Sequence, residues 1–183
     1  MIGVIDTCFL IDWSRFRRRE ILEKLFNVLL IHEEVLRQIR SESAIGYVSE
    51  LFTKGVLRLY PWSNMDEKEF IILRSQVSSN SRIPSLERPD LLCLIIAYNS
   101  DAVLLSENVG IHRVVQYHPR YSHVEVWIAL DVIEQSVYKG LIKVDSEEDF
   151  LSIVKEYELD THHSFRKNKV RSAIERVREW LMR

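Results

Sequence analysis

Five short apolar runs, separated by segments with helical periodicity, constrain the fold of this chain more than any other feature. Each run is four or five residues long and rich in valine, isoleucine and leucine, which is typical of strands buried on both faces. The runs are Ile2–Ile5, Val28–Ile31, Val56–Tyr60, Ala102–Leu105 and Val124–Ile128. Because strands of this kind alternate with helices, the sequence predicts an α/β fold with a parallel sheet.

The segments between these runs predict the helices that cover the sheet. Their apolar residues recur at the spacing of one helical face. The predicted helices are Arg18–Phe26, Glu33–Arg40, Ile45–Lys54, Asp66–Val77, Leu86–Asn99, His112–Tyr117 and Asp131–Tyr138. Helices packed on a parallel sheet give a three-layer domain.

The last forty residues differ because they contain no strand pattern. Ser146 and Asp149 form a capping-box pattern that predicts one helix, and an amphipathic helix is predicted from Phe165 to the chain end. We therefore expect a domain over residues 1–144 and a helical extension over 145–183, which packs on that domain or on a partner.

Composition excludes several classes of protein. The 183 residues suit one domain, and the net charge of −2 gives no whole-molecule signal for nucleic acid, so such binding needs local patches. No apolar run approaches the ~20 residues of a membrane span, and no basic leader precedes Asp6. We expect a cytoplasmic protein with no membrane association, with Cys8 and Cys93 reduced in its core. Neither a zinc motif nor a nucleotide-binding loop is present.

Polar residues follow two of the predicted strands. Asp6 and Thr7 follow the first, Ser106 and Asn108 follow the fourth, and Asp90 lies in the first turn of an apolar helix. Ligands of parallel sheets gather outside the carboxyl ends of the strands, so these side chains are expected to converge. Each also fits a simpler structural role in a turn or a first helical turn. Asp6 lies inside an apolar stretch, where a carboxylate needs a polar partner or a cation.

Three segments resemble, in their order and spacing, the motifs of PIN domains, the VapC-like nuclease family. Val4–Ile11 is similar to the opening strand of the family, which ends in Asp-Ser/Thr. Leu86–Ala97 with Asp90 is similar to its third-acid helix, and Ala102–Asn108 to the strand that ends in Leu-Leu-Thr-x-Asp. The resemblance covers about residues 1–140. It implies RNA cleavage dependent on Mg²⁺ or Mn²⁺, and in many members a homodimer and an antitoxin partner.

Two positions depart from the pattern of that family. Gln38 occupies the glutamate position of the second-acid motif in Val35–Ile39, and Asn108 occupies the fourth acid position. The resemblance therefore implies Asp6, Gln38, Asp90 and Asn108 as the catalytic positions, two of them amides. A unit charge pair at 4 Å contributes ~4 kcal/mol at an effective dielectric constant of 20, so losing carboxylates weakens metal binding.

Nearby glutamates offer replacement charge. Glu34 and Glu42 lie four residues before and after Gln38 and share its helical face if that helix is unbroken. Glu107 is a weaker candidate because adjacent strand residues point to opposite faces, unless the strand has already ended there. The expected metal ligands are Asp6, Asp90, Glu34 and Glu42.

Hydroxyl and basic side chains are the candidates for holding RNA. The hydroxyls are those of Thr7 and Ser106, and the basic residues belong to the cluster Arg15–Arg19. The expected substrate-binding residues are Thr7, Ser106, Arg15, Arg17 and Arg18. The basic face of the final helix either keeps it soluble or follows an RNA backbone, and His162–His163 is expected to be a loop pair.

Three functions remain open from the sequence. The leading hypothesis is a metal-dependent endoribonuclease of the PIN type. The alternative is a catalytically inactive PIN-like module for RNA binding or protein assembly, in which the amides hold the old site together by hydrogen bonds. A third interpretation is an α/β domain with unknown small-molecule chemistry. The position of the acids relative to one another separates these hypotheses.

Overall fold

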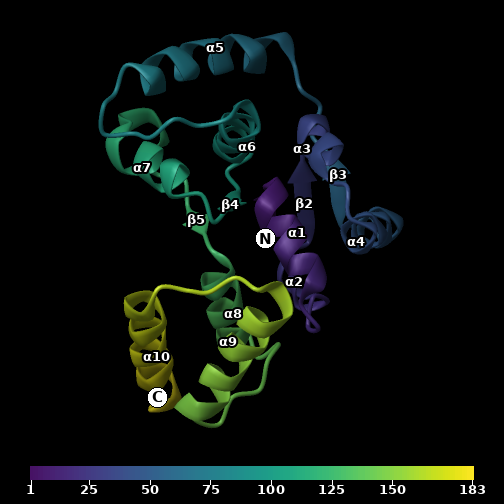
Figure 1. The fold of residues 1–183 in the computed structure, drawn as a ribbon, viewed down its shortest axis with the longest axis vertical. Helices are drawn as coiled ribbons and strands as arrows, with labels where there is room; N and C mark the ends of the chain where they lie inside the picture. Colours follow the sequence, from purple (N-terminus) through teal and green to yellow (C-terminus); the bar gives the residue numbers. More distant parts are fainter.

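The fold is a five-stranded parallel sheet with helices on both faces (Figure 1). The computed structural model describes residues 1–183. The strand order is β3-β2-β1-β4-β5, and every neighbouring pair is parallel. The strands are β1 (Ile2–Ile5), β2 (Val28–Ile31), β3 (Leu57–Leu59), β4 (Val103–Leu105) and β5 (Val126–Trp127). All five predicted strands are present, and the predicted α/β class is confirmed.

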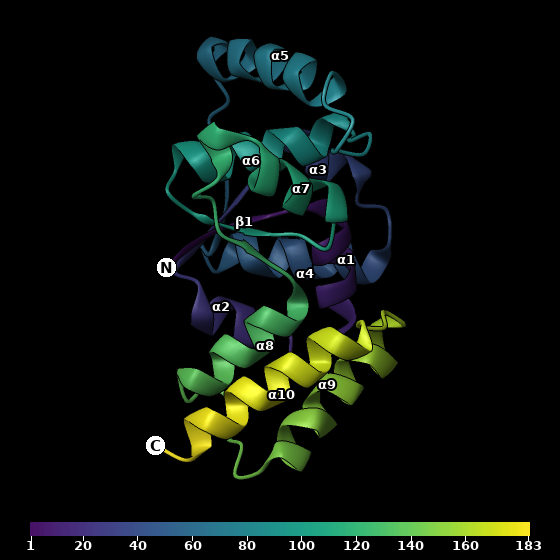
Figure 2. The same ribbon diagram turned by 90° about the vertical axis from the view of Figure 1, so that its left-hand side faces the viewer.

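Ten α-helices and one short 3₁₀ segment complete the chain. They are α1 (Thr7–Arg15), α2 (Ile21–Leu25), α3 (Glu33–Gln38), α4 (Glu42–Thr53), α5 (Asn64–Ser78), α6 (Arg88–Asn99), α7 (Val109–Tyr117), η1 (Pro119–Tyr121), α8 (Ala129–Tyr138), α9 (Glu147–Thr161) and α10 (Lys167–Leu181). In Figure 2, β1 lies between α6 and α4, which gives the three layers. None of these helices combines the length and apolar character needed to span a bilayer.

The centre of the sheet determines where polar groups can gather. The chain passes from β1 to β2 and β3 on one side, and returns to β4 and β5 on the other. The carboxyl ends of β1 and β4 therefore form a topological switch point, where such folds bind ligands. Ile5 pairs with Leu105 in register, and the Asp6 N–H donates to the Leu105 carbonyl at 3.2 Å. Asp6 and Ser106 consequently leave the sheet side by side.

Helix α1 corrects the sequence prediction, which contains no helix over Thr7–Arg15. The apolar run Val4–Ile11 continues from a buried strand into a buried helix, so hydrophobicity alone does not mark the change. The signal lies in Asp6, whose side chain accepts a hydrogen bond from the Phe9 N–H and caps α1. This N-cap places the rest of α1 beside the end of the sheet.

The helical segment around Gln38 is broken, which overturns the premise that Glu34, Gln38 and Glu42 share a face. Helix α3 ends at Gln38, and α4 begins at Glu42. Ser41 caps α4 through a 3.4 Å hydrogen bond from the Ala44 N–H. Glu42 therefore belongs to a different helix from Glu34.

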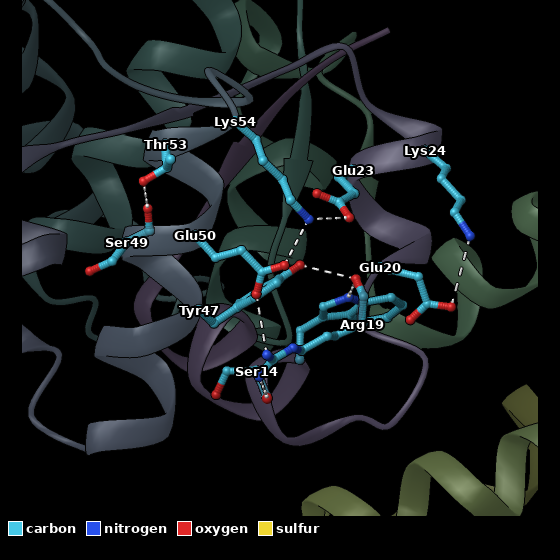
Figure 3. Close-up of polar contacts among 11 residues, drawn as sticks. Ser14, Arg19, Glu20, Glu23, Lys24, Tyr47, Ser49, Glu50, Thr53 and Lys54 are labelled. Atoms are coloured by element: carbon cyan, nitrogen blue, oxygen red, sulfur yellow. Dashed lines mark hydrogen bonds and ion pairs between the residues drawn. The ribbon is translucent and has the colours of Figure 1, made fainter.

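Polar contacts tie α4 to the turn between α1 and α2 (Figure 3). The Tyr47 hydroxyl donates to the Arg19 carbonyl at 3.0 Å, and the Arg19 guanidinium lies over the Tyr47 ring. Arg19 also pairs with Glu50, while Lys54 binds both Glu50 and Glu23. Arg19 thus has a structural role within the basic cluster.

The C-terminal extension packs on its own domain. Helix α9 contacts α1 and α8, and α10 contacts α8 and α9, at the end of the molecule opposite α5 (Figures 1 and 2). Its buried side chains Phe150, Tyr157 and Val177 belong to the same 53-residue core cluster as the central strands. The extension therefore shares the domain core, whereas the division at residue 144 stays a prediction.

An ion pair between buried Glu134 and half-exposed Arg176 holds α10 against α8. Glu134 is 3% exposed, and Arg176 donates two parallel hydrogen bonds to it at 2.7 and 2.6 Å. The Tyr138 hydroxyl donates a third bond to the same carboxylate at 2.7 Å. Such a fork satisfies most of the acceptor capacity of a buried carboxylate.

We predict that Arg176→Ala lowers the free energy of unfolding by ~2 kcal/mol. The substitution leaves the Glu134 charge buried with only Tyr138 as a partner, and the half-exposed position of Arg176 keeps the loss below that of a fully buried pair. Urea unfolding measures the change. Arg171→Ala is the control, because Arg171 is 84% exposed and pairs only with Glu175 on its own helix. Equal midpoints for the two variants would contradict this assignment.

Candidate functional site

A cavity of about 540 Å³ opens at the carboxyl ends of β1 and β4. Four residues that the resemblance implied as catalytic positions line it: Asp6, Gln38, Asp90 and Asn108. Thr7 lines it as well. These residues come from four separate segments of the chain, so the parallel sheet and its helices bring them together.

Asp6 is the most deeply buried of these side chains, at 5% exposure. Its Oδ1 accepts from the Phe9 N–H at 2.7 Å, and the Ser106 hydroxyl is a second partner. Burial, with a smaller contribution from the nearby Asp90 and Glu107 carboxylates, raises the pKa of Asp6 to about 7 against the lowering effect of the Ser106 and Phe9 hydrogen bonds. Asp6 is thus an acid held near its titration point in a low-dielectric site.

Asp90 combines a structural role with a place in the cavity. It lies in the first turn of α6 after Pro89, and it accepts from the Glu87 N–H at 3.1 Å. Burial raises the pKa of Asp90, while the Asn108 amide, as a hydrogen-bond partner, lowers it. The first-turn role and the site role of Asp90 are therefore compatible.

The two amides are each fixed by hydrogen bonds. The Thr7 hydroxyl donates to Gln38 Oε1 at 2.5 Å, and Asn108 Oδ1 caps α7 by accepting from the Gly110 N–H at 2.8 Å. The Asn108 N–H donates to Ser106 Oγ at 3.1 Å. Asn108 is thus held by Ser106 and by the start of α7, whereas Gln38 is held by Thr7.

Three acids that the sequence reasoning did not select also line the cavity: Asp12, Glu87 and Glu107. Glu107 reaches it because β4 ends at Leu105, so strand alternation no longer applies; its carboxylate also accepts from the Ala129 N–H at 2.7 Å. Burial raises the pKa of both Asp12 and Glu107. The cavity therefore holds more carboxylates than the expected pair.

Recognition of α1 as a helix would have revealed one of these acids. Cys8 and Asp12 lie four residues apart on α1, and both line the cavity. Cys8 is exposed, which corrects the expectation of a core position, whereas Cys93 is buried as expected. Because Thr7–Arg15 is a helix, Cys8 and Asp12 lie on the same face of it, and that face lines the cavity.

His163 comes to the cavity from the C-terminal extension. Its Nδ1 lies 3.5 Å from Asp12 Oδ2, and its Nε2 lies 3.6 Å from Glu107 Oε2. The sequence suggested only a loop histidine pair. No local pattern could have found this residue, because its position depends on how α9 and α10 dock.

The expected replacement glutamates lie elsewhere. Glu34 accepts from Arg88 Nε at 3.0 Å, and Arg88 also binds Glu67 through two hydrogen bonds. Glu42 is exposed at the start of α4. Neither lines the cavity, so Glu87 and Glu107 are the glutamates that stand near the two amides.

The expected phosphate-binding arginines are engaged in ion pairs. Arg17 forms a forked pair with Asp160, and Arg18 binds Glu156 at 2.6 Å, both on α9. Arg15 lies 3.8 Å from Asp12, the one contact of these three with a cavity acid. None of the three lines the cavity itself.

The donor chemistry of the cavity fits a hard divalent cation. Carboxylate, amide and hydroxyl oxygens are the ligands that Mg²⁺ and Mn²⁺ prefer. Several of these carboxylates have raised pKa values because burial removes water, and a cation between them would offset that cost. No group of three or more His, Cys, Asp or Glu side chains is arranged to hold a metal ion as it stands. The chemistry fits, but the ligand arrangement is not preassembled.

We predict that Asp6→Asn stabilises the fold at alkaline pH. The folded pKa of Asp6 is about 7, against 3.8 for a free aspartate, so ionised Asp6 opposes folding above pH 7 and this cost declines as pH falls toward 3.8. Asparagine still caps α1 and carries no charge. Urea unfolding should give a gain of ~2–4 kcal/mol at pH 8 that shrinks by most of its size at pH 5.

Asp145→Asn is the matched control for this measurement, because the Asp145 carboxylate is exposed. It should change the unfolding free energy little at either pH. A gain from Asp6→Asn that does not vary with pH would rule out a buried, titrating carboxylate as its cause.

This chain resembles known proteins in its structure but not in its sequence. No family model matches the sequence, and no curated protein matches it. The fold is similar to a chain in the crystal structure of VapBC2 from Rickettsia felis bound to a DNA fragment from its promoter, with a TM-score of 0.51 and 18% identity. The match covers 70% of this chain and 98% of that chain. This likeness supports a PIN-like fold, as the sequence motifs predicted.

Proposed function

We propose that this chain is a metal-dependent endoribonuclease of the PIN type that hydrolyses RNA phosphodiester bonds. One observation carries the proposal: Asp6 and Asp90, both with raised pKa values, face one cavity at the switch point of a PIN-like sheet. Carboxylates clustered in this way are costly for folding and are typical of sites that bind a cation.

In this proposal Asp6 and Asp90 hold Mg²⁺ or Mn²⁺, and Glu107 or Glu87 supplies the negative charge that the amides lack. A bound divalent cation would supply an activated water and neutralise charge on the leaving oxygen. The Phe9 N–H fixes one oxygen of Asp6, and the Glu87 N–H fixes one oxygen of Asp90. These second contacts limit the rotation of both carboxylates.

The hydroxyl groups position the substrate in this proposal. Gln38 accepts the Thr7 hydroxyl hydrogen and so fixes the orientation of that group at the cavity. Ser106 is buried between Asp6 and the backbone N–H of Asn108. Thr7 is the more exposed of the two, so it is the better candidate for contacting a phosphate oxygen.

The first test measures metal binding and cleavage on the same samples. Calorimetric titration of Mn²⁺ into the wild type should give binding, and RNA cleavage should require Mn²⁺. Asp6→Asn should abolish both while the protein stays folded, because it removes a buried carboxylate and keeps the N-cap of α1.

Glu42→Gln is the control for this test, since Glu42 is an exposed acid outside the cavity. It should leave Mn²⁺ affinity and cleavage unchanged. A wild type that neither binds Mn²⁺ at millimolar concentration nor cleaves RNA would refute the nuclease proposal and favour the inactive module for RNA binding or protein assembly.

A second test restores an acid. We predict that Gln38→Glu raises Mn²⁺ affinity about tenfold, because a carboxylate then faces the cavity where the amide stood. Without metal the same change adds repulsion beside Asp6 and Asp90, so the variant should gain more thermal stability from Mn²⁺ than the wild type. Gln116→Glu on the exposed face of α7 is the control. Equal Mn²⁺ affinities of wild type and Gln38→Glu would separate Gln38 from the metal site.

The partners belong to the same proposal. The similar solved structure is a VapBC2 complex with promoter DNA, which supports an antitoxin-type protein partner and a toxin role for this chain. Helix α5 exposes Met65, Ile71 and Ile72, an apolar surface of the kind that partners cover. RNA as substrate and a homodimer follow from the family resemblance, and light scattering of the purified chain decides between monomer and dimer.

A further inference from the structure

A second cavity of about 290 Å³ adjoins the acidic one. The two share Glu107 and His163 in their linings, so His163 lies at the boundary between them. The second cavity is also lined by His112 of α7 and by Arg166 and Lys169 at the start of α10. The charged residues of the first cavity are therefore mainly acidic and those of the second mainly basic, and Glu107 and His163 lie between them.

Neither of the two cations of this second cavity forms an ion pair. Arg166 and Lys169 are exposed, and neither takes part in an ion pair. Later arginines of α10 differ, since Arg171, Arg176 and Arg178 each pair with a glutamate. Unpaired positive charge is thus concentrated at the end of α10 that faces the site.

The start of α10 adds to the preference for an anion. Arg166 is the N-cap residue and makes no side-chain capping bond, and the first turn contains no acid. The first N–H groups of a helix lack intrahelical partners and carry the positive end of the helix dipole. At the start of α10 they lie beside two unpaired cations, so the electrostatic preference of this end is for a negatively charged ligand.

His112 provides an independent sign of a ligand. Its Nε2 is buried and has no hydrogen-bond partner. In the neutral imidazole one ring nitrogen is a hydrogen-bond acceptor, and Nε2 has no protein partner that prevents it from taking this role. Burial and the nearby Lys169 lower the pKa of His112, which favours this neutral form. A buried acceptor in a cavity calls for a hydroxyl or another donor.

We propose that this second cavity is a subsite for the sugar-phosphate backbone of single-stranded RNA, next to the site of cleavage. Arg166, Lys169 and the start of α10 hold a phosphate, and His112 Nε2 accepts a hydrogen bond from a ribose 2′-hydroxyl. The inference rests on the proposed function for its substrate. It assigns backbone binding to the C-terminal extension, at the boundary where His163 meets the acids.

The arrangement of charge explains why the extension suits this task. The acidic cavity repels a polyanion when no cation is bound, so RNA needs positive charge beside it. Arg17 and Arg18 are the nearby alternative, but Asp160 and Glu156 of α9 offset their charge. Arg166 and Lys169 have no such partners, and they line the second cavity, which adjoins the acidic one.

The test is RNA binding by the full-length chain without metal, so that cleavage does not interfere. Fluorescence anisotropy of a labelled single-stranded RNA in EDTA compares the wild type with the double variant Arg166→Ala/Lys169→Ala. The double variant should bind at least tenfold more weakly at low salt. The slope of log K against log salt should also fall by about 0.7, since the two cations share one phosphate and each phosphate contact with a single strand contributes ~0.7.

Lys68→Ala/Arg74→Ala is the matched control, because it removes the same charge from exposed positions of α5 at the opposite end of the molecule (Figures 1 and 2). It should leave the salt slope within experimental error of the wild type. Circular dichroism confirms that both double variants are folded. Equal losses of RNA affinity in the two double variants would overturn the subsite.

The 2′-hydroxyl contact has its own test. The wild type should prefer RNA over DNA of the same sequence, and His112→Phe, which keeps a ring but removes Nε2, should reduce that preference about fivefold. An RNA preference that is unchanged in His112→Phe would overturn the role of His112.

Different results would refute the nuclease proposal and the RNA subsite. RNA binding that depends on Arg166 and Lys169, without Mn²⁺-dependent cleavage, would refute the nuclease proposal and support the subsite. Mn²⁺-dependent cleavage with RNA affinity unaffected by Arg166→Ala/Lys169→Ala would support the nuclease and refute the subsite.

Discussion

Asp6 ends the central strand, caps the following helix and faces the cavity with 5% of its surface exposed. Its N–H bonds to Leu105, and its carboxylate contacts Phe9 and Ser106, so this residue joins β1, α1 and the end of β4. A carboxylate so deeply desolvated opposes folding when ionised. This unfavourable carboxylate lies at the switch point between β1 and β4, where ligands bind in such folds, and a bound ligand can offset its cost.

The C-terminal extension changes which charged side chains surround the cavity. By pairing with Arg17 and Arg18, α9 places Asp160 and Glu156 against the basic cluster, and the turn that follows α9 carries His163 to Asp12 and Glu107. Docking of α9 and α10 therefore redistributes charge around the cavity. The acidic site at the end of the sheet thereby gains neighbouring cations, Arg166 and Lys169, from a segment about 160 residues after Asp6.

The sequence predicted the five strands and most helices because each buries a short apolar run or one periodic face. It also predicted that Asp6, Asp90 and Asn108 converge, since strand ends and first helical turns are recognisable locally. The resemblance to PIN domains added Gln38, and all four residues line the cavity. It failed at α1, where a buried strand runs into a buried helix without a change in hydrophobicity. The prediction that Glu34 and Glu42 replace the missing acids required one unbroken helix around Gln38. In the structure α3 ends at Gln38, and Ser41 caps a new helix.

By itself the sequence determined the parallel α/β fold and the places of Asp6, Asp90 and Asn108, because these follow from periodicity and from residues at the ends of local elements. The place of Gln38 followed from the resemblance to PIN domains. Only the tertiary structure decided which charges meet. Glu107 and His163 reach the cavity through the end of β4 and the docking of the extension, and Arg17 and Arg18 find partners on α9. Electrostatic interactions between distant segments depend on separations of a few ångströms, and no local pattern encodes those distances.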